Sequence, residues 1–279
     1  EKAHAESIKS LGIDKIPTNW WDNVNMLHDR LNPFIEYADN PVPFNAGVWR
    51  YHPIKDRFEV VAHGTSNPWG LDFNAKGQIF TTACVIPHLW HIVPGGIYHR
   101  QASSHFNENA YDDIRTIADH RHRSAHGGAR VYQSDAFPAE YRGQVFMGNI
   151  HEHAVLTDKL IPKGSSYVGE HGEEFLLANN AQFVGFSTEI GPEGGVYMLD
   201  WHDADICGDK VLTRDTGRVY RITPKESKAE LWEGRFDDLE SFSDLYLVNL
   251  QTKNSSWHSR RARLILQNRA SKDQRDQNA

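Results

Sequence analysis

Histidines gather in three short stretches of this sequence, each beside acidic or basic residues. The stretches are HRHRSAH (120–126), HEH (151–153) and DWHD (200–203). Imidazole titrates near neutral pH and can act as a general base, and together with carboxylates it binds transition metals. The stretches therefore indicate a metal site, a proton-transfer site or a polar corner of an all-β protein, and the surrounding elements must distinguish these.

The surrounding sequence is typical of short strands. From Gly47 onward, runs of β-branched and aromatic residues alternate with Gly, Pro, Asn and Asp. The order strand, turn, strand, loop, strand occurs in 67–93, 125–158 and 182–208, with turn glycines at 77, 143 and 194. Two further segments, 47–64 and 217–234, resemble each other and are expected to be outer hairpins. A four-stranded unit repeated about every 50 residues is typical of a β-propeller.

We therefore predict an all-β fold, a partial β-propeller of about three and a half blades of four antiparallel strands, followed by a C-terminal helix pair. Propellers have typically 4–8 blades, and an open ring exposes strand edges. We expect that the chain is a fragment of a longer protein, or that another segment or subunit completes the ring. The first residue is Glu1 and no signal peptide precedes it, which favours a processed or excised piece.

The predicted division of the chain has three parts. Residues 1–44 form an irregular segment with a short helix near 24–31, residues 45–238 form the blades, and residues 239–279 form the helical segment. Apolar residues at helical spacing after a Ser/Asn break predict that the second helix starts near Ser255-Ser256, with a serine as N-cap. Residues 271–279 are polar and are expected to fray.

Polar residues are expected to converge at one mouth of the ring, because the first strand of each unit starts where the second strand ends. We predict a central pocket with three catalytic residues and three metal ligands. The catalytic residues are His126, Asp200 and His202, and the metal ligands are His151, His153 and Asp203. On a strand, His151-x-His153 would direct both rings to one side. The alternative is that these histidines only hydrogen-bond to strand ends and line a wet channel.

Other residues near this mouth allow two interpretations each. Arg121 and Arg123 either bind an anionic cofactor group or belong to a solvated loop, and His120 and His122 are interpreted as loop residues. Trp69 either packs between blades or stacks on a sugar or cofactor. Gly127-Gly128 is expected to leave room for a ligand to approach the backbone.

Composition excludes several function classes. The net charge of −7 argues against a nucleic-acid-binding surface. The sequence contains no run of about 18 apolar residues, which is the length needed to span a membrane. The two cysteines, Cys84 and Cys207, form no CxxCH motif, which excludes haem attachment to this chain. They fall in non-adjacent units, so we expect two thiols and no disulfide.

Four stretches resemble the propeller domain of the membrane-bound dehydrogenases of planctomycetes and verrucomicrobia, which are haem-binding proteins. They are GVWRYHPIKDRFEVVAHGTSNPWGLDF, CVIPHLWHIVPGG, AHGGARVYQSDAFPAEYRGQVFMGNIHEHAVLTD and VGFSTEIGPEGGVYMLDWHDADICG. In that family HEAT-like helical repeats and a c-type haem domain follow the propeller, and the tail WHSRRARLILQNRA resembles the first helical repeat. The resemblance covers roughly residues 45–270.

That family is distantly similar to soluble sugar dehydrogenases, which use pyrroloquinoline quinone with Ca²⁺ and a catalytic histidine. The resemblance therefore implies a periplasmic or secreted oxidoreductase that acts on a sugar-like alcohol, with His126 as the catalytic histidine. It also implies pyrroloquinoline quinone and Ca²⁺ as cofactors and a c-type haem domain as a partner. The alternative function is a non-catalytic binding module for glycans or a protein partner.

Overall fold

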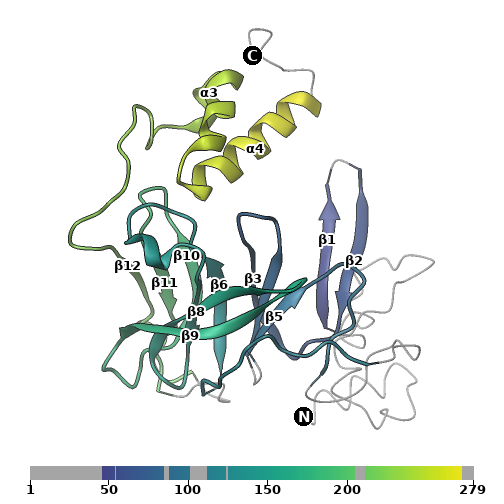
Figure 1. Cartoon of the computed structure of the whole chain (residues 1–279). Coiled ribbons are helices and arrows are strands. Elements are labelled where there is room, and N and C mark those ends of the chain that lie inside the picture. The colour runs from purple at the N-terminus through teal and green to yellow at the C-terminus, as the bar shows by residue number, and fades with distance from the viewer. Residues whose placement is uncertain are drawn as a thin grey trace, which may run out of the picture.

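The computed structural model describes residues 46–53, 55–84, 88–100, 112–123, 125–204 and 211–271. These residues form four antiparallel sheets, with helices beyond one end of the sheets (Figure 1). This architecture confirms the predicted all-β class, the partial propeller and the C-terminal helices. The short helix expected near 24–31 lies outside the described residues.

The strands of each sheet follow one another in chain order, as in a propeller blade. The first sheet pairs β1 (Gly47–His52) with β2 (Arg57–His63), and the second contains β3 (Pro68–Phe73), β4 (Ile79–Ala83) and β5 (Leu89–Ile92). The third contains β6 (His126–Val131), β7 (Val145–Asn149), β8 (Ala154–Lys163) and β9 (Ser166–Leu177). The fourth contains β10 (Gly185–Ile190), β11 (Val196–Asp200) and β12 (Arg218–Ile222).

Apolar side chains fill the spaces between consecutive sheets. Val61 of the first sheet packs with Trp90 of the second, and Phe80 of the second packs with Met147 of the third. A further cluster joins the third and fourth sheets through Phe146, Val155, Val196 and Met198. Each cluster draws residues from two neighbouring sheets, so the blades stack face to face and bury apolar area that no single blade could bury alone.

The first strands of the blades, β3, β6 and β10, pack side by side at the centre. Glycines make this approach feasible, since a Cβ atom on Gly127 would lie 2.7 Å from the Cα atom of Phe186. A Cβ atom on Gly128 would lie 2.7 Å from the backbone nitrogen of Thr188. The expectation that Gly127-Gly128 leaves room for a ligand is therefore wrong, because β10 occupies that space. The described strands of the first and fourth sheets do not pack closely against each other, so the four described sheets do not close a ring.

Local signals correctly predicted the turns that join the first two strands of each blade. Gly77, Gly143 and Gly194 have φ values of 75°, 89° and 84°, which glycine adopts without a steric cost. The second predicted outer hairpin is only half present, because β12 is a strand and 223–232 is not. Instead, the Lys228 amide donates to the Ala136 carbonyl, which ties this segment to a turn of the third sheet.

The helical segment lies beyond the turn ends of the blades (Figure 1). It contains α3 (Asp244–Asn249) and α4 (Ser256–Ser271), and short 3-10 turns occur at Ala139–Tyr141, Leu239–Ser241 and Leu250–Thr252. The predicted helix start at Ser255-Ser256 is confirmed. The Ser256 amide donates to the Gln133 carbonyl at 2.9 Å, which attaches the start of α4 to the third sheet.

Candidate functional site

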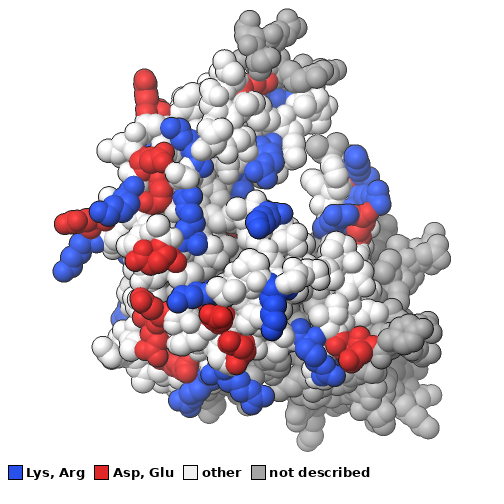
Figure 2. All heavy atoms as spheres, in the orientation of Figure 1, with Lys and Arg blue, Asp and Glu red and all other residues white. Residues whose placement is uncertain are grey.

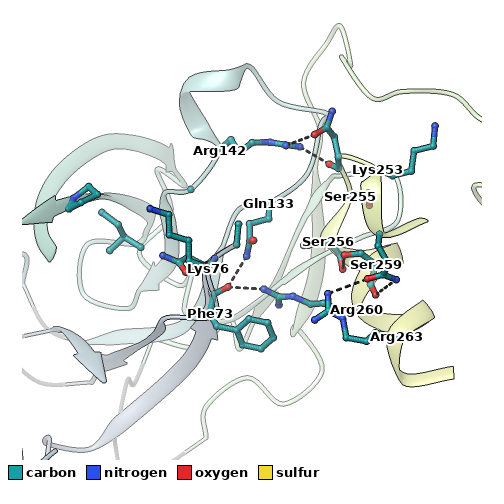
Figure 3. A pocket seen from close by; sticks show the side chains of 18 of the residues that line it. Phe73, Lys76, Gln133, Arg142, Lys253, Ser255, Ser256, Ser259, Arg260 and Arg263 are labelled. Atoms are coloured by element: carbon teal, nitrogen blue, oxygen red, sulfur yellow. Dashed lines mark hydrogen bonds between the residues drawn. The ribbon is translucent and has the colours of Figure 1, made fainter. Parts of the chain in front are cut away.

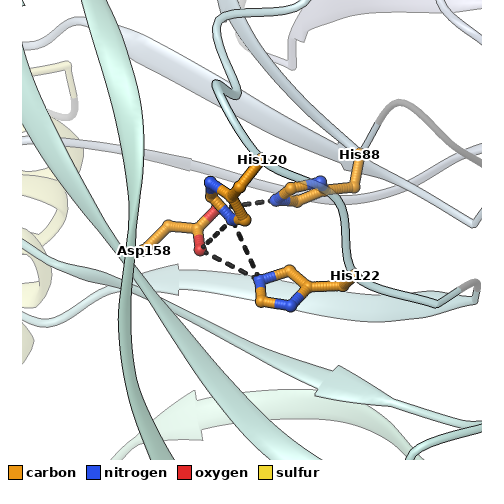
Figure 4. A group of neighbouring side chains, drawn as sticks. All are labelled: His88, His120, His122 and Asp158. Atoms are coloured by element: carbon orange, nitrogen blue, oxygen red, sulfur yellow. Dashed lines mark hydrogen bonds and ion pairs between the residues drawn. The ribbon is translucent and has the colours of Figure 1, made fainter.

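Three imidazoles surround one buried carboxylate between the second and third sheets (Figure 4). His88 Nε2 lies 2.6 Å from Asp158 Oδ2. His120 Nε2 and His122 Nε2 lie 3.1 and 3.2 Å from Asp158 Oδ1, and 3.1 Å from each other. We refer to His88, His120, His122 and Asp158 as the histidine cluster.

Residues 112–123 place two of the histidines by crossing from the second sheet to the third. The Ile117 amide donates to the Leu89 carbonyl of β5, and the Gly169 amide of β9 donates to the Ile117 carbonyl. The Asp119 amide then donates back to Gly169 at 3.1 Å. This backbone pairing fixes the chain just before His120, while His88 precedes β5 and Asp158 lies on β8.

Electrostatics in the histidine cluster follow from burial and hydrogen bonding. Burial raises the pKa of Asp158, but hydrogen bonds from His120, His122 and His88 outweigh it and hold the pKa well below its usual range. The hydrogen bond to Asp158 raises the pKa of His120 to about 9, against burial and with help from Asp119. Burial lowers the pKa of His88 despite the same carboxylate.

His126 lies beside the cluster and is fully buried. Its ring stacks on His88 with centroids 4.5 Å apart, and neither ring nitrogen forms a hydrogen bond of normal geometry within the described structure. Burial, together with His88 and His122, lowers the pKa of His126 to about 3, although Asp158 and the nearby Ala83 carbonyl act in the opposite direction. The sequence predicts His126 as a pocket-rim residue, but its ring is packed within the interior.

A second pair of polar residues, Asp200 and His202, lies at the end of β11 and just after it. Asp200 Oδ2 is 3.0 Å from His202 Nδ1, and Asp200 Oδ1 accepts hydrogen bonds from the amides of Val184 and His202. Arg218 Nη1 also lies 2.9 Å from Nδ1. The two contacts of Nδ1 favour opposite tautomers, because Asp200 Oδ2 accepts a proton from Nδ1 whereas Arg218 Nη1 can only donate to it. In the tautomer that donates to Asp200, His202 Nε2 carries a lone pair.

Aromatic rings continue from this pair onto the inner strands. Trp201 lies 6.3 Å from Phe186 of β10, and Phe186 lies 6.2 Å from Trp69 of β3, measured between ring centroids. Trp201 is 50% exposed and Trp69 is 38% exposed. We call Trp69, Phe186 and Trp201 the aromatic row. Large exposed rings of this kind provide flat faces for stacking.

The three predicted metal ligands do not come together in the structure. His151 is exposed, His153 Nδ1 donates to the Phe183 carbonyl, and Asp203 Oδ2 accepts from the amides of Leu212 and Thr213. His151 and His153 lie in a turn before β8, so the argument from strand alternation does not apply to them. The described residues contain one group with metal-ligand geometry, and it is the histidine cluster.

The predicted cofactor residues have different surroundings. Arg121 and Arg123 are exposed, as in the solvated-loop interpretation, and Trp69 belongs to the aromatic row. Cys84 is buried, whereas Cys207 lies outside the described residues, so the absence of a disulfide stays a prediction.

Asp158 is the functional candidate that sequence reasoning missed, along with the role of His120 and His122. It ends the run AVLTD on β8, and all five residues of that run are buried. An aspartate in a buried run must find partners, because an unpaired buried carboxylate is costly. That signal could have drawn attention to Asp158, but the spacing of the histidines could not.

A cavity of about 470 Å³ lies at the turn ends of the blades, between the sheets and α4 (Figure 3). Its lining includes five cationic side chains and no carboxylate, namely Lys76, Arg142, Lys253, Arg260 and Arg263. Arg142 bonds to Asn254, and Arg260 bonds to Asp72 at 2.7 Å. Figure 2 shows Lys and Arg interspersed with Asp and Glu on this side of the molecule.

The donor groups were compared with the cofactors implied by the resemblance. Ca²⁺ takes six to eight oxygen ligands, and the histidine cluster offers one carboxylate among three imidazoles, so it does not fit Ca²⁺. Pyrroloquinoline quinone carries three carboxylates, and Arg218 is the one cation that contacts the Asp200–His202 pair among the described residues. This pair alone therefore does not supply the cations that would hold the quinone.

Comparison with solved structures finds distant similarity to sugar dehydrogenases. A glucose dehydrogenase from Thermus thermophilus is 20% identical, with a TM-score of 0.45, over 58% of this chain and 47% of that one. The aldose sugar dehydrogenase from Streptomyces coelicolor, solved with pyrroloquinoline quinone bound, is 16% identical, with a TM-score of 0.38, over 58% and 44%. The chain thus spans less than half the length of these proteins.

Other comparisons bear on the sequence as a whole. No curated protein sequence matches this chain. No helix among the described residues is long and apolar enough to cross a membrane. The family model for a domain of unknown function, DUF7133, matches residues 29–226, which is more than half of the sequence, and the chain therefore belongs to this family.

Proposed function

We propose that this domain binds a sugar-like alcohol beside the aromatic row and oxidises it, with His202 as the general base. The observation that carries the proposal is the Asp200–His202 pair, which can present a lone pair on Nε2 of His202, the residue that follows the exposed Trp201 directly in sequence. The open ring favours further segments or subunits that complete the propeller. A periplasmic or secreted location and electron transfer to a c-type haem domain are part of the same proposal.

Each residue has a defined part in this chemistry. Trp201 and Trp69 present flat faces to the apolar side of a sugar ring, which orients the reacting hydroxyl. His202 Nε2 accepts the hydroxyl proton, and Asp200 stabilises the imidazolium that forms. The choice of oxidation follows from the sequence resemblance to dehydrogenases. The carbon-bound hydrogen leaves with its two electrons as hydride, which balances the oxidation of the alcohol to a carbonyl, and it needs a quinone-type acceptor that the described residues do not themselves provide.

His126 and Arg218 have secondary parts in this proposal. The resemblance assigned catalysis to His126, but its burial and its pKa of about 3 make it a poor base near neutral pH. Arg218 Nη1 lies 2.9 Å from His202 Nδ1 and donates to this nitrogen in the other tautomer of the ring.

A second candidate function is a glycan-binding module without catalysis. The aromatic row favours it, because stacking on exposed rings needs no base. The two candidates differ only in whether His202 is needed after the sugar has bound.

The test uses the full chain, a panel of aldoses and dye reduction with and without added pyrroloquinoline quinone and Ca²⁺. His202→Gln should lower kcat by about 10²–10⁴-fold with sugar binding retained, and Trp201→Ala should raise KM. His52→Gln is the matched control, since His52 is exposed on the β1–β2 hairpin. Binding without turnover in the wild type would favour the glycan-binding module. A wild-type chain that neither binds nor oxidises any of the aldoses would contradict both candidates.

A further inference from the structure

We propose that His88, His120, His122 and Asp158 bind one divalent first-row transition-metal ion between the second and third sheets. This inference is independent of the proposed function, because it uses no residue of the Asp200–His202 pair or the aromatic row.

The first argument is convergence. One donor atom from each of the four side chains lies within 4.8 Å of the other three. A tetrahedral site with bonds of about 2.0–2.2 Å separates its ligand atoms by about 3.3–3.6 Å. The hydrogen-bonded donor atoms lie 2.6 to 3.2 Å apart, so an outward shift of at most about 1 Å would admit an ion.

The second argument concerns hydrogens. His120 Nε2 and His122 Nε2 both face Asp158 Oδ1 and lie 3.1 Å from each other. If both nitrogens are protonated, their hydrogens crowd each other. If His122 Nε2 is unprotonated, its lone pair faces a carboxylate oxygen. A cation at the centre resolves this conflict, because all four side chains can then direct lone pairs at it.

The third argument is the chemistry of the donors. Imidazole suits zinc, copper, iron and nickel, whereas Ca²⁺ and Mg²⁺ take oxygen ligands. Three imidazoles and one carboxylate from the protein make a four-coordinate set, which Zn²⁺ accepts readily. Zn²⁺ is therefore the probe that best represents this class of ion.

The surroundings support the ligands and leave a route for the ion. His120 Nδ1 lies 3.0 Å from Asp119 Oδ1, and a carboxylate in this position orients a metal-binding imidazole. His126 stacks on His88 and restricts the rotation of its ring. The His120 side chain is 18% exposed, and the exposed His171 lies 4.7 Å from the His122 ring, so an ion can enter from solvent.

The main experiment measures Zn²⁺ binding to the full chain after treatment with a chelator. Titration calorimetry and elemental analysis should give one Zn²⁺ per chain with a sub-micromolar Kd, and Ca²⁺ at the same concentration should not bind. Co²⁺ in place of Zn²⁺ should give visible absorption bands of tetrahedral intensity. Absence of stoichiometric Zn²⁺ binding by the folded chain would overturn the proposal.

Variants then locate the site. Asp158→Asn and His120→Gln should each weaken Zn²⁺ binding by about 100-fold or more. His120 is partly exposed, so His120→Gln decides the question if Asp158→Asn fails to fold. The matched control combines His151→Gln with His153→Gln and should keep the wild-type Kd. Loss of binding in this control, with binding retained in His120→Gln, would refute the assignment and favour the HEH stretch.

Discussion

Charged groups meet in two regions of this molecule, the histidine cluster and the junction between the blades and the helical segment. At the junction, Arg235 and Arg260 each have a carboxylate and a carbonyl as partners. Arg235 forms two hydrogen bonds to Asp135, and Arg260 bonds to Asp72 and to the Phe73 carbonyl. In the histidine cluster, three potential cations share one carboxylate, and two imidazole nitrogens face each other.

The two regions differ in purpose: the junction holds parts of the chain together, whereas the histidine cluster is suited to binding a ligand. A guanidinium between carboxylates and carbonyls has its donors satisfied by the protein, so the junction holds two parts of the chain together. In the histidine cluster, the imidazole nitrogens face one another and one carboxylate, and no placement of their protons satisfies all of these contacts. A cation at the centre would accept a lone pair from each side chain. Charge alone would have suggested the opposite, since the basic cavity is the more conspicuous feature.

The largest expected effect is at Arg235, which is 2% exposed. Replacing Arg235 by Met should destabilise the protein by about 3–5 kcal/mol, because it leaves the Asp135 carboxylate unpaired in a largely buried place. Urea denaturation measures the change. Arg50→Met, which removes an exposed ion pair with Glu59, should cost much less, because solvent screens this pair and Arg57 still contacts Glu59. Equal losses in the two variants would show that the junction does not depend on this ion pair.

The next effect is metal removal at the histidine cluster. At a free Zn²⁺ concentration about 100-fold above Kd, the ion should stabilise the folded chain by about 2.7 kcal/mol. Thermal unfolding with Zn²⁺ and with a chelator measures the difference, which should disappear in His120→Gln. The same Tm with Zn²⁺ and with the chelator would contradict a bound ion.

A smaller effect is expected at Arg260, whose side chain is 26% exposed and stacks on Phe73 at 3.9 Å. Arg260→Ala should cost about 1–2 kcal/mol, since it removes hydrogen bonds to a carboxylate and a carbonyl. Hydrogen exchange should become faster in α4 and stay unchanged in β6 and β7. Uniformly faster exchange would show that α4 and the blades unfold as one unit.

The last prediction concerns pH and His258. Its Nε2 lies 2.7 Å from the Arg235 carbonyl and its Nδ1 lies 2.7 Å from Ser255 Oγ. Burial lowers the pKa of His258 below 6.5, so below that pH the unfolded chain binds a proton that the folded chain resists. This contribution to stability is present above pH 6.5 and is lost as the pH falls. His258→Gln should show a shallower loss of stability than the wild type between neutral and acidic pH. Identical slopes would contradict it.

Features set by local chemistry could be predicted from the sequence. The turn glycines need positive φ, and the start of α4 follows from a serine before apolar residues at helical spacing. The strand order within the blades could be predicted from the same turn-forming residues between the strand segments. These signals act within a few residues and do not depend on the rest of the chain.

Features set by register and packing could not be predicted. Asp158 faces the second sheet only because β8 pairs with β7 in one register, with Val145 opposite Asp158. His120 and His122 join it because 112–123 pairs with both β5 and β9 across a long separation in sequence. Gly127-Gly128 resembled a ligand site, but the pair serves the contact between inner strands.

The central claim is that the histidine cluster, and not the HEH stretch, holds the metal ion. A crystal of the full chain grown with Zn²⁺ and measured at the zinc absorption edge tests it most directly. The account predicts one strong anomalous peak about 2.0–2.2 Å from the Nε2 atoms of His88, His120 and His122 and from an Asp158 oxygen. A dominant peak at His151 and His153, or a cluster without a peak while Zn²⁺ binds elsewhere, would contradict it.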